Sequence, residues 1–265
     1  MPENRKHHLI SPRAIVNRTA EIEEGVKIFP YAIVEENSFI GKDTVIYPFA
    51  VIGAESVIGP KNKIYQGVII GMPPLDLKYR GEKTRVVIGE GNVIREYTTI
   101  HKATGEGEET KIGNYNLIMA YCHISHNCSI GNHNIITNFC QIAGHCQIFD
   151  FANIGGMTGI HQHVRVGSYS FVGACSYLKK DLLPFMIGEG NPFRVRGLNT
   201  VGLRRNGFSP EKIALLKKVY RLIFRSKLNL KEALREIEKL SSSEEVRLIL
   251  DFIRKTERGI ELRTK

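Results

Sequence analysis

The sequence predicts an all-β solenoid, a parallel β-helix of hexapeptide repeats, followed by a small C-terminal α-helical domain. Three observations support this prediction. An aliphatic residue recurs at every sixth position over two thirds of the chain, the repeat stops near residue 183, and helix signals follow it. The 265 residues are enough for two such domains, each with its own apolar core.

The six-residue repeat begins at Ile10 and runs to Leu178. Every sixth residue between them is Ile, Val or Leu, apart from Asp76, Glu82 and Glu106. A period of six fits a short strand followed by a tight turn, and three such units form one triangular coil of roughly 18 residues. Stacked coils bury the aliphatic side chains in ladders, to which β-branched residues are suited. The predicted β-helix covers residues 8–183.

Two further positions of the repeat carry a signature. The fourth residue after each aliphatic residue is small, often Ala, Ser, Thr or Cys, and we expect it to point inward. The residue directly after the aliphatic one is often glycine, as at Gly41 and Gly155. We interpret this glycine as a turn position that needs positive φ.

Five cysteines without a CxxC pair exclude a disulfide framework or a zinc finger as the organising feature. Four of them form two pairs at the spacing of one coil, Cys122 with Cys140 and Cys128 with Cys146. Stacking would bring each pair near disulfide distance. Because they occupy the small inward position, we expect free thiols.

Breaks in the repeat predict two loops, at residues 71–85 and 102–111. The first contains a Pro pair and dense charge, and the second is polar and rich in glycine. Loops that project from a rigid solenoid often carry function. Residues 184–208, with several Pro and Gly, are expected to form an irregular connecting segment.

The last segment, 209–265, is predicted to form three amphipathic helices. Ser209 followed by Pro210 fits a cap and first-turn proline before a helix over 211–226. Asn229, with Glu three residues later, resembles a capping box before 230–240. A third helix is expected over 244–259, ending near Gly259.

Charge is unevenly distributed along the chain. The formal net charge is +10, and residues 179–265 supply all of it, because residues 1–178 contain equal numbers of acidic and basic residues. Such a basic module fits nucleic acid, anionic lipid, an acidic protein or a phosphate-bearing ligand, or serves as a solubilising surface. No apolar run reaches the length of a membrane span, and the first residues lack the apolar segment of a secretory signal, so we expect a cytoplasmic protein.

Most histidines lie in one part of the chain, and the repeat geometry places five of them on one narrow edge over three coils. These five are His123, His126, His145, His161 and His163, whereas His133 is expected on the surface elsewhere. Solvated histidines, a metal site and a general base with substrate-binding neighbours are all compatible with this column. The two loops would add Asp76, Lys78 and His101 to the same edge.

The chain as a whole resembles the bacterial UDP-N-acetylglucosamine acyltransferases, which catalyse the first acylation of lipid A synthesis. The resemblance rests on the repeats, the two loops, the closing helices and the strings DLKY, IREYTTIHK, HISHNC, AGHC, GGMTGIHQ and GLRRNGFS. It implies a left-handed parallel β-helix and a homotrimer with active sites between subunits. It also implies an acyl donor carried on acyl carrier protein, a UDP-sugar acceptor, and neither a cofactor nor a metal, with no nucleic acid partner.

The same resemblance implies a role for individual residues. His126 would be the general base that takes the proton from the sugar 3-hydroxyl, and the Gly144 N–H would stabilise the oxyanion. Substrate contacts would come from Asp76, Lys78, His101, His123, His145, His161, Gln162, Asn199 and Arg205, the last two in the nucleotide and diphosphate region. Ala174 matches the position that limits acyl-chain length. Acyl carrier protein is acidic, which gives the basic residues of 179–265 a partner.

Four positions depart from the pattern of this family. Leu75 replaces a frequent Gln near the reacting position of the sugar, so a 3-hydroxyl or a 3-amino acceptor remains open. Asn127 stands where Asp is frequent, and Val201 and Asn206 replace a Glu and an Arg near the nucleotide. The alternatives are a γ-class carbonic anhydrase, the later N-acyltransferase of the same pathway, and a structural or ice-binding solenoid.

Overall fold

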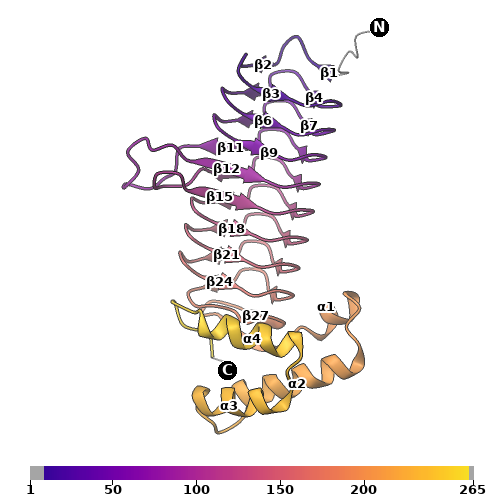
Figure 1. The fold of residues 1–265 in the computed structure, drawn as a ribbon, viewed down its shortest axis with the longest axis vertical. Helices are drawn as coiled ribbons and strands as arrows, with labels where there is room; N and C mark the ends of the chain where they lie inside the picture. The colour runs from indigo at the N-terminus through magenta and orange to yellow at the C-terminus, as the bar shows by residue number, and fades with distance from the viewer. Residues whose placement is uncertain (1–8, 263–265) are drawn as a thin grey trace.

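The computed structural model describes residues 9–262, which form a parallel β-helix capped at its C-terminal end by helices (Figure 1). Residue 8, the predicted start of the β-helix, and residues 263–265 lie outside the described residues. The chain winds through three sheets in turn, so each strand pairs with the strand three places later in the chain. The all-β solenoid predicted from the six-residue period is therefore confirmed.

The three walls of the β-helix are three sheets. The eleven-stranded sheet consists of β1 (Leu9–Ile10), β4 (Lys27–Ile28), β7 (Val45–Ile46), β10 (Lys63–Ile64), β13 (Val93–Ile94), β16 (Leu117–Ile118), β19 (Ile135–Ile136), β22 (Asn153–Ile154), β25 (Phe171–Val172), β27 (Met186–Glu189) and β28 (Arg194–Leu198). The nine-stranded sheet consists of β2 (Ile15–Val16), β5 (Ile33–Val34), β8 (Val51–Ile52), β11 (Ile69–Met72), β14 (Thr99–His101), β17 (His123–Ile124), β20 (Gln141–Ile142), β23 (Gly159–Ile160) and β26 (Tyr177–Leu178). The eight-stranded sheet consists of β3 (Glu21–Ile22), β6 (Phe39–Ile40), β9 (Val57–Ile58), β12 (Arg85–Ile88), β15 (Glu109–Ile112), β18 (Ser129–Ile130), β21 (Gln147–Ile148) and β24 (Arg165–Val166).

The aliphatic ladder fills the interior of the β-helix. From Ile28 to Leu178 its side chains are at most 2 % exposed, whereas Ile10, in the first coil, is 40 % exposed because no coil covers it. Parallel pairing stacks each residue on its counterpart in the next coil, as in Ile130 on Ile148. Each buried Ile or Leu contributes about 2 kcal/mol relative to an exposed one.

Most glycines that follow the aliphatic residue have a different role from the one expected, although Gly71 has positive φ as predicted. Gly41 and Gly155 do not have positive φ; the positive-φ position lies two residues later and holds Asn, His or an aromatic residue in many coils. The glycine is needed because neighbouring coils approach closely. A Cβ on Gly41 would lie 2.6 Å from the carbonyl carbon of Gly59 in the next coil.

The small inward position is occupied as predicted in most coils. Cys122, Cys128, Cys140 and Cys146 are buried and free, which confirms the expected thiols. One corner departs from this pattern, because Asn62, Asn92, Asn116 and Asn134 occupy the same position and are fully buried or nearly so. Each of the last three donates its main-chain N–H to the amide oxygen of the one before, at 2.8–2.9 Å. This ladder satisfies buried polar groups that a small apolar residue would leave unpaired.

The segment 184–208, expected to be irregular, is ordered. β27 pairs parallel with β25 and antiparallel with β28, and a short helix, α1 (Thr200–Arg205), follows. The hexapeptide pattern misses β27 and β28 because the aliphatic period has already ended. These elements close the open end of the eleven-stranded sheet.

Three longer helices complete the chain, α2 (Pro210–Phe224), α3 (Leu230–Leu240) and α4 (Glu244–Arg254). Ser209 caps α2 and Asn229 forms a capping box with Glu232, as their sequence signals predict. α4 ends at Arg254 instead of near Gly259.

Buried hydrogen bonds join the last coil to the C-terminal segment. The Asp181 carboxylate accepts hydrogen bonds from the Arg165 N–H (2.8 Å) and the Thr256 hydroxyl (2.7 Å). The Arg165 guanidinium lies against the rings of Phe149 and Phe252, with its Cζ 5.3 Å and 4.2 Å from their centroids, and donates to the Phe252 carbonyl at 3.0 Å. Burial is the main reason that the pKa of Asp181 is raised above its usual range.

We predict that Gly59→Ala destabilises the β-helix by about 1–3 kcal/mol, as overpacking does in other cores. The added Cβ would lie 2.6 Å from the Gly89 carbonyl oxygen. Gly197→Ala is the control, because its Cβ would meet no atom closer than 3.9 Å. Urea unfolding followed by circular dichroism measures both, and equal midpoints for the two variants would contradict this account of close coil packing.

Candidate active site

Both loops leave the β-helix at the same corner, between the nine-stranded and eight-stranded sheets (Figure 1). The first, residues 73–84, connects β11 to β12, and the second, residues 102–108, connects β14 to β15. They are shorter than predicted because β11, β12 and β15 extend into the expected loops by two, one and three residues, respectively. The next turn at this corner, between β17 and β18, carries His126, so both loops border this residue.

His126 lies at the centre of this corner and is largely buried, with 14 % of its side chain exposed. Its Nδ1 is 2.9 Å from Asn127 Oδ1, and its Nε2 is 4.0 Å from Asp76 Oδ2 on the first loop. The backbone N–H of Lys78 donates to Asp76 at 3.0 Å and is the main cause of the lowered pKa of Asp76. Asp76 is therefore a carboxylate at neutral pH, held beside the imidazole.

Gly144 lies one coil after His126 and packs directly against its ring. A Cβ at Gly144 would lie 2.5 Å from the Cε1 and Nε2 atoms of His126, so no other residue fits without moving the imidazole. Within residues 9–262, the Gly144 N–H has no hydrogen-bond acceptor, while its carbonyl accepts from the His163 N–H at 3.1 Å. The corner thus combines an imidazole with a free N–H donor on Gly144, the residue that packs against the ring.

Three other imidazoles surround His126 and are held neutral. Burial, followed by the neighbouring His101 and His126, lowers the pKa of His123 to about 4. Burial is also the first cause of the lowered pKa of His101 and His145. The rings of His101 and His123 lie 5.0 Å apart, and those of His126 and His145 5.1 Å apart, both pairs edge to face.

The predicted column of five histidines divides at this corner. His123 and His161 face a hollow over the nine-stranded sheet, whereas His145 and His163 stack on the other side with ring centroids 4.6 Å apart. His126 lies between the two groups. His133 is exposed at a different corner, as expected, and stacks between Tyr115 and Phe151.

The hollow on the nine-stranded sheet has a volume of about 380 Å³. His123, Ser125, Gln141, Gly159, His161, Gln162 and Tyr177 are among its lining residues. Gly159 makes room for it, because it lies between Gln141 and Tyr177 in a column of outward side chains. Gln141 and Tyr177 are not among the predicted site residues, although their place one residue before the aliphatic position indicates the outer face.

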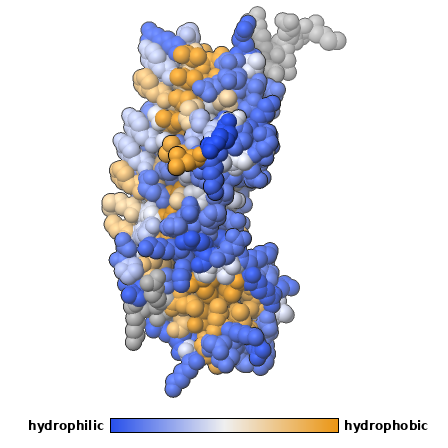
Figure 2. Space-filling view, turned by 90° about the vertical axis from the view of Figure 1, so that its left-hand side faces the viewer, coloured by the Kyte–Doolittle hydropathy of each residue, from blue (hydrophilic) through white to orange (hydrophobic). Residues whose placement is uncertain are grey.

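Two predicted residues lie at the edges of this site. Lys78 is exposed on the first loop, next to Leu75 and Leu77, which are 80 % and 94 % exposed. The tip of this loop faces the viewer in Figure 2, with hydrophobic and hydrophilic surface side by side. Ala174 is exposed at the turn between β25 and β26, at the opposite corner of the nine-stranded sheet from His126.

Asn199 and Arg205 are not brought to His126 within the chain. They line a separate hollow of about 430 Å³ over the eleven-stranded sheet, together with His133, Val201 and Asn206. Asn199 also caps α1, because its Oδ1 accepts from the Gly202 N–H at 3.0 Å. The predicted site residues therefore form two groups on different faces of one chain.

Comparison with known proteins identifies the family. The sequence model of the family "UDP N-acetylglucosamine O-acyltransferase, domain 2" matches residues 181–261. The sequence model of the family "bacterial transferase hexapeptide (six repeats)" matches residues 109–144. The acyl-[acyl-carrier-protein]–UDP-N-acetylglucosamine O-acyltransferase of Alkalilimnicola ehrlichii is 45 % identical over 253 residues, which are 95 % of this chain and 98 % of the relative. The chain belongs to the UDP-N-acetylglucosamine O-acyltransferase family.

Further relatives agree with this assignment. The protein of the same name from Gloeothece citriformis is 45 % identical over 180 residues, which are 68 % of this chain and 65 % of that relative, just under two thirds. The solved UDP-N-acetylglucosamine O-acyltransferase of Moraxella catarrhalis is 42 % identical with a TM-score of 0.92, covering 96 % of this chain and 99 % of that one. The Bacteroides fragilis structure is 40 % identical with a TM-score of 0.93, covering 95 % and 99 %.

Within this acyltransferase family, the departure at Asn127 has a structural counterpart. The His126 imidazole is hydrogen-bonded to an amide oxygen and not to a carboxylate.

Among the described residues, no group of three or more His, Cys, Asp or Glu side chains is arranged to hold a metal ion. No helix in this described part of the chain is long and apolar enough to cross a membrane.

We predict that the free energy of unfolding falls as the pH drops from 7 to 5, partly because of His123. Its pKa of about 4 in the folded chain lies below the ordinary value of 6.5, so the unfolded chain binds more protons in this range. After discounting for solvent screening, the contribution is about 1 kcal/mol. Urea unfolding at pH 7 and pH 5 should show a smaller loss for His123→Gln than for the wild type.

The exposed His133 supplies the control, because it lies at another corner and His133→Gln should keep the pH dependence of the wild type. An equal loss of stability in the wild type and His123→Gln would contradict the buried, neutral state of His123.

Proposed function

We propose that this chain transfers a 3-hydroxyacyl chain from acyl carrier protein to the 3-position of UDP-N-acetylglucosamine or its 3-amino analogue. This reaction is the first step of lipid A biosynthesis. The observation that carries the proposal is the pairing of His126 with the free N–H of Gly144, at a corner bordered by both loops. Family membership supplies the substrate classes.

In the proposed mechanism, His126 Nε2 takes the proton from the sugar hydroxyl or amine as that atom attacks the thioester carbonyl. The tetrahedral intermediate carries an oxyanion, which the Gly144 N–H stabilises. Its collapse breaks the carbon–sulfur bond, and the imidazolium returns the proton to the departing thiolate. The carboxylate of Asp76, 4.0 Å from Nε2, stabilises the transient imidazolium.

The chemistry is complete with side chains and one main-chain donor, so we propose that no cofactor or metal takes part. Direct transfer needs no nucleophilic residue on the enzyme. The buried cysteines agree with this, because burial raises the pKa of the Cys128 thiol well above its usual range. A buried thiol of this kind is a poor nucleophile at neutral pH.

The acyl chain is proposed to lie in the hollow on the nine-stranded sheet. His123, His161, Gln162 and Tyr177 line this hollow and would contact the sugar or the acyl chain. The proposed path of the acyl chain leads from His126 across the sheet to the corner that carries Ala174. A methyl group at that corner would shorten the space for the chain end. Lys78 and His101, from the two loop regions, would bind the sugar side.

The nucleotide is proposed to bind Asn199 and Arg205 of a neighbouring subunit. Within one chain these two residues lie on another face from His126, so a single chain cannot offer all the predicted contacts to one UDP-sugar. A homotrimer with active sites between subunits would combine them. Val201 and Asn206, which replace a Glu and an Arg of the family pattern, line the same hollow and would change the contacts to the nucleotide.

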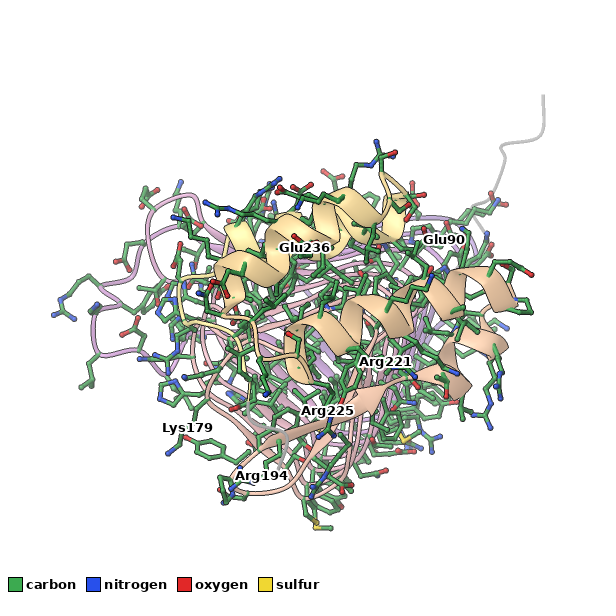
Figure 3. All side chains as sticks on the ribbon, turned by 90° about the horizontal axis from the view of Figure 1, so that it is seen from below. Glu90, Lys179, Arg194, Arg221, Arg225 and Glu236 are labelled. Atoms are coloured by element: carbon green, nitrogen blue, oxygen red, sulfur yellow. The ribbon has the colours of Figure 1, made fainter. Side chains whose placement is uncertain are left out.

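The basic residues of the C-terminal helices are proposed to guide acyl carrier protein to the site. Figure 3 shows Arg221 in α2 and Arg225 directly after it, with Arg194 and Lys179 on the same side of the view and Glu236 on the other. Among the described residues, no carboxylate lies within ion-pair distance of Arg221 or Arg225. Unpaired arginines accelerate association with an acidic partner.

Because acyl carrier protein and UDP-sugars are cytoplasmic, we place the reaction in the cytoplasm.

Acyl transfer by the purified protein tests the proposed reaction. We expect transfer from 3-hydroxyacyl carrier protein to one of the two UDP-sugars, and a loss of about 100-fold or more in His126→Ala, the range for removal of a general base. Several chain lengths offered with both sugars would also establish the preferences that Leu75 and Ala174 leave open. Circular dichroism confirms that the variant folds.

No transfer to either sugar, together with stoichiometric zinc and hydration of carbon dioxide, would overturn the acyltransferase proposal in favour of a carbonic anhydrase.

Reversal of charge on α2 tests the docking of acyl carrier protein. Arg221→Glu and Arg225→Glu should raise KM for the acyl carrier several-fold at low salt, with kcat nearly unchanged, and the effect should shrink at high salt. Arg18→Glu is the matched control, because Arg18 is exposed near the opposite end of the β-helix. Equal KM values for all variants at low salt would rule out docking at this surface.

A further inference from the structure

One residue of the second loop holds both ends of the Asn127 amide. Asn127 Oδ1 accepts from the Thr104 N–H at 2.9 Å, and Asn127 Nδ2 donates to the Thr104 carbonyl at 3.0 Å. The Asn127 N–H donates to the Thr110 hydroxyl at 2.9 Å. A main-chain N–H can only donate and a carbonyl can only accept, so the amide has a single allowed orientation.

This orientation determines which nitrogen of His126 carries the hydrogen. Nδ1 lies 2.9 Å from Asn127 Oδ1, which can only accept, so Nδ1 carries the hydrogen and Nε2 keeps its lone pair. A general base needs that lone pair on the nitrogen that faces the substrate. Free neutral imidazole prefers the opposite tautomer, with the hydrogen on Nε2.

We propose that Thr104 and Asn127 form a positioning pair that fixes the tautomer of His126 and links the base to the second loop. The proposal rests on the proposed function of His126 and adds a requirement to it. The base is competent only while residues 102–108 are docked on the corner, because Thr104 provides the two contacts that orient the amide. Asn127 acts through His126 and is not itself a catalytic residue.

An amide serves this purpose better than a carboxylate in this chain. Aspartate at position 127 would set a second oxygen against the Thr104 carbonyl, and two acceptors repel each other. It would also favour the imidazolium form of His126. The other titratable groups that interact with His126 are Asp76, His101, His123 and His145, of which only Asp76 is acidic. Asn127 therefore orients the ring without adding charge.

Nitrogen-15 NMR of the imidazoles in the full-length protein without substrates tests the tautomer directly. The wild type should show His126, assigned by its loss in His126→Ala, with the hydrogen on Nδ1. In Asn127→Ala the Nε2–H tautomer should become substantially populated. Asn127→Asp should keep Nδ1–H but move the acid limb of kcat/KM to higher pH. A wild-type His126 with its hydrogen on Nε2, or no change in Asn127→Ala, would overturn the proposal.

Hydrogen exchange tests the link to the loop. The Thr104 amide should lose protection at least ten-fold in Asn127→Ala but keep it in Asn127→Asp, where an acceptor remains. Asn37→Ala and Asn37→Asp are matched controls, because Asn37 also has positive φ at a turn and its amide donates to Glu55 Oε1 at 2.9 Å. They should change neither the His126 tautomer nor the Thr104 amide. Unchanged exchange at Thr104 in Asn127→Ala would disprove the link.

Kinetics separate this proposal from the proposed function. Asn127→Ala should lower kcat by about 10- to 100-fold, with KM for the UDP-sugar nearly unchanged, because only the base is misoriented. If the wild type transfers no acyl chain while NMR and exchange behave as expected, the proposed function fails and the positioning pair stands. If the wild type transfers and Asn127→Ala is unimpaired in all three measurements, the positioning pair fails alone.

Discussion

The stacking of one coil on the next is the constraint on which the rest of the structure depends. Parallel hydrogen bonds between coils leave no freedom of register, so each residue lies on its counterpart one coil earlier. This packing buries a continuous aliphatic ladder, removes room for a Cβ at Gly41 and Gly155, and lines up buried asparagines into a hydrogen-bonded ladder. A change in one coil is therefore felt in its neighbours, and local defects propagate along the axis.

The same constraint creates the site. The two loops replace simple turns at one corner in successive coils, and the strands on either side return to register, as in Val57 with Val87 and Thr99 with His123. Everything inserted at that corner must project outward, because the interior is filled. The next turn carries His126, so two loops far from it in sequence supply its neighbours, Asp76 and Thr104 through Asn127. A rigid wall thus positions the proposed base, which flexible segments alone could not orient.

The electrostatic balance of the corner suits proton transfer. Burial and mutual proximity keep His101, His123 and His145 neutral, so they add no positive charge around the imidazole of His126. Within residues 9–262, Asp76 is the one carboxylate within 4.0 Å of Nε2, and a main-chain N–H lowers its pKa. In the proposed mechanism, an imidazolium formed at His126 would lie 4.0 Å from the Asp76 carboxylate, whereas the neutral imidazole contacts the Asn127 amide oxygen.

The sequence alone determined the solenoid, its inward ladder, the free thiols, the caps of the C-terminal helices and the gathering of histidines near His126. All of these follow from a fixed period or from a short local signal, and the resemblance to a family added individual roles. Only the tertiary structure decided the division of the histidines between two faces, the hydrogen bonds that hold Asn127, and the separation of Asn199 and Arg205 from His126. It also revealed β27, β28 and α1, which the six-residue period cannot indicate. Apart from the histidines, whose positions within the repeat differ, these features depend on contacts between segments whose spacing in the chain is not a multiple of the repeat, so no periodic pattern encodes them.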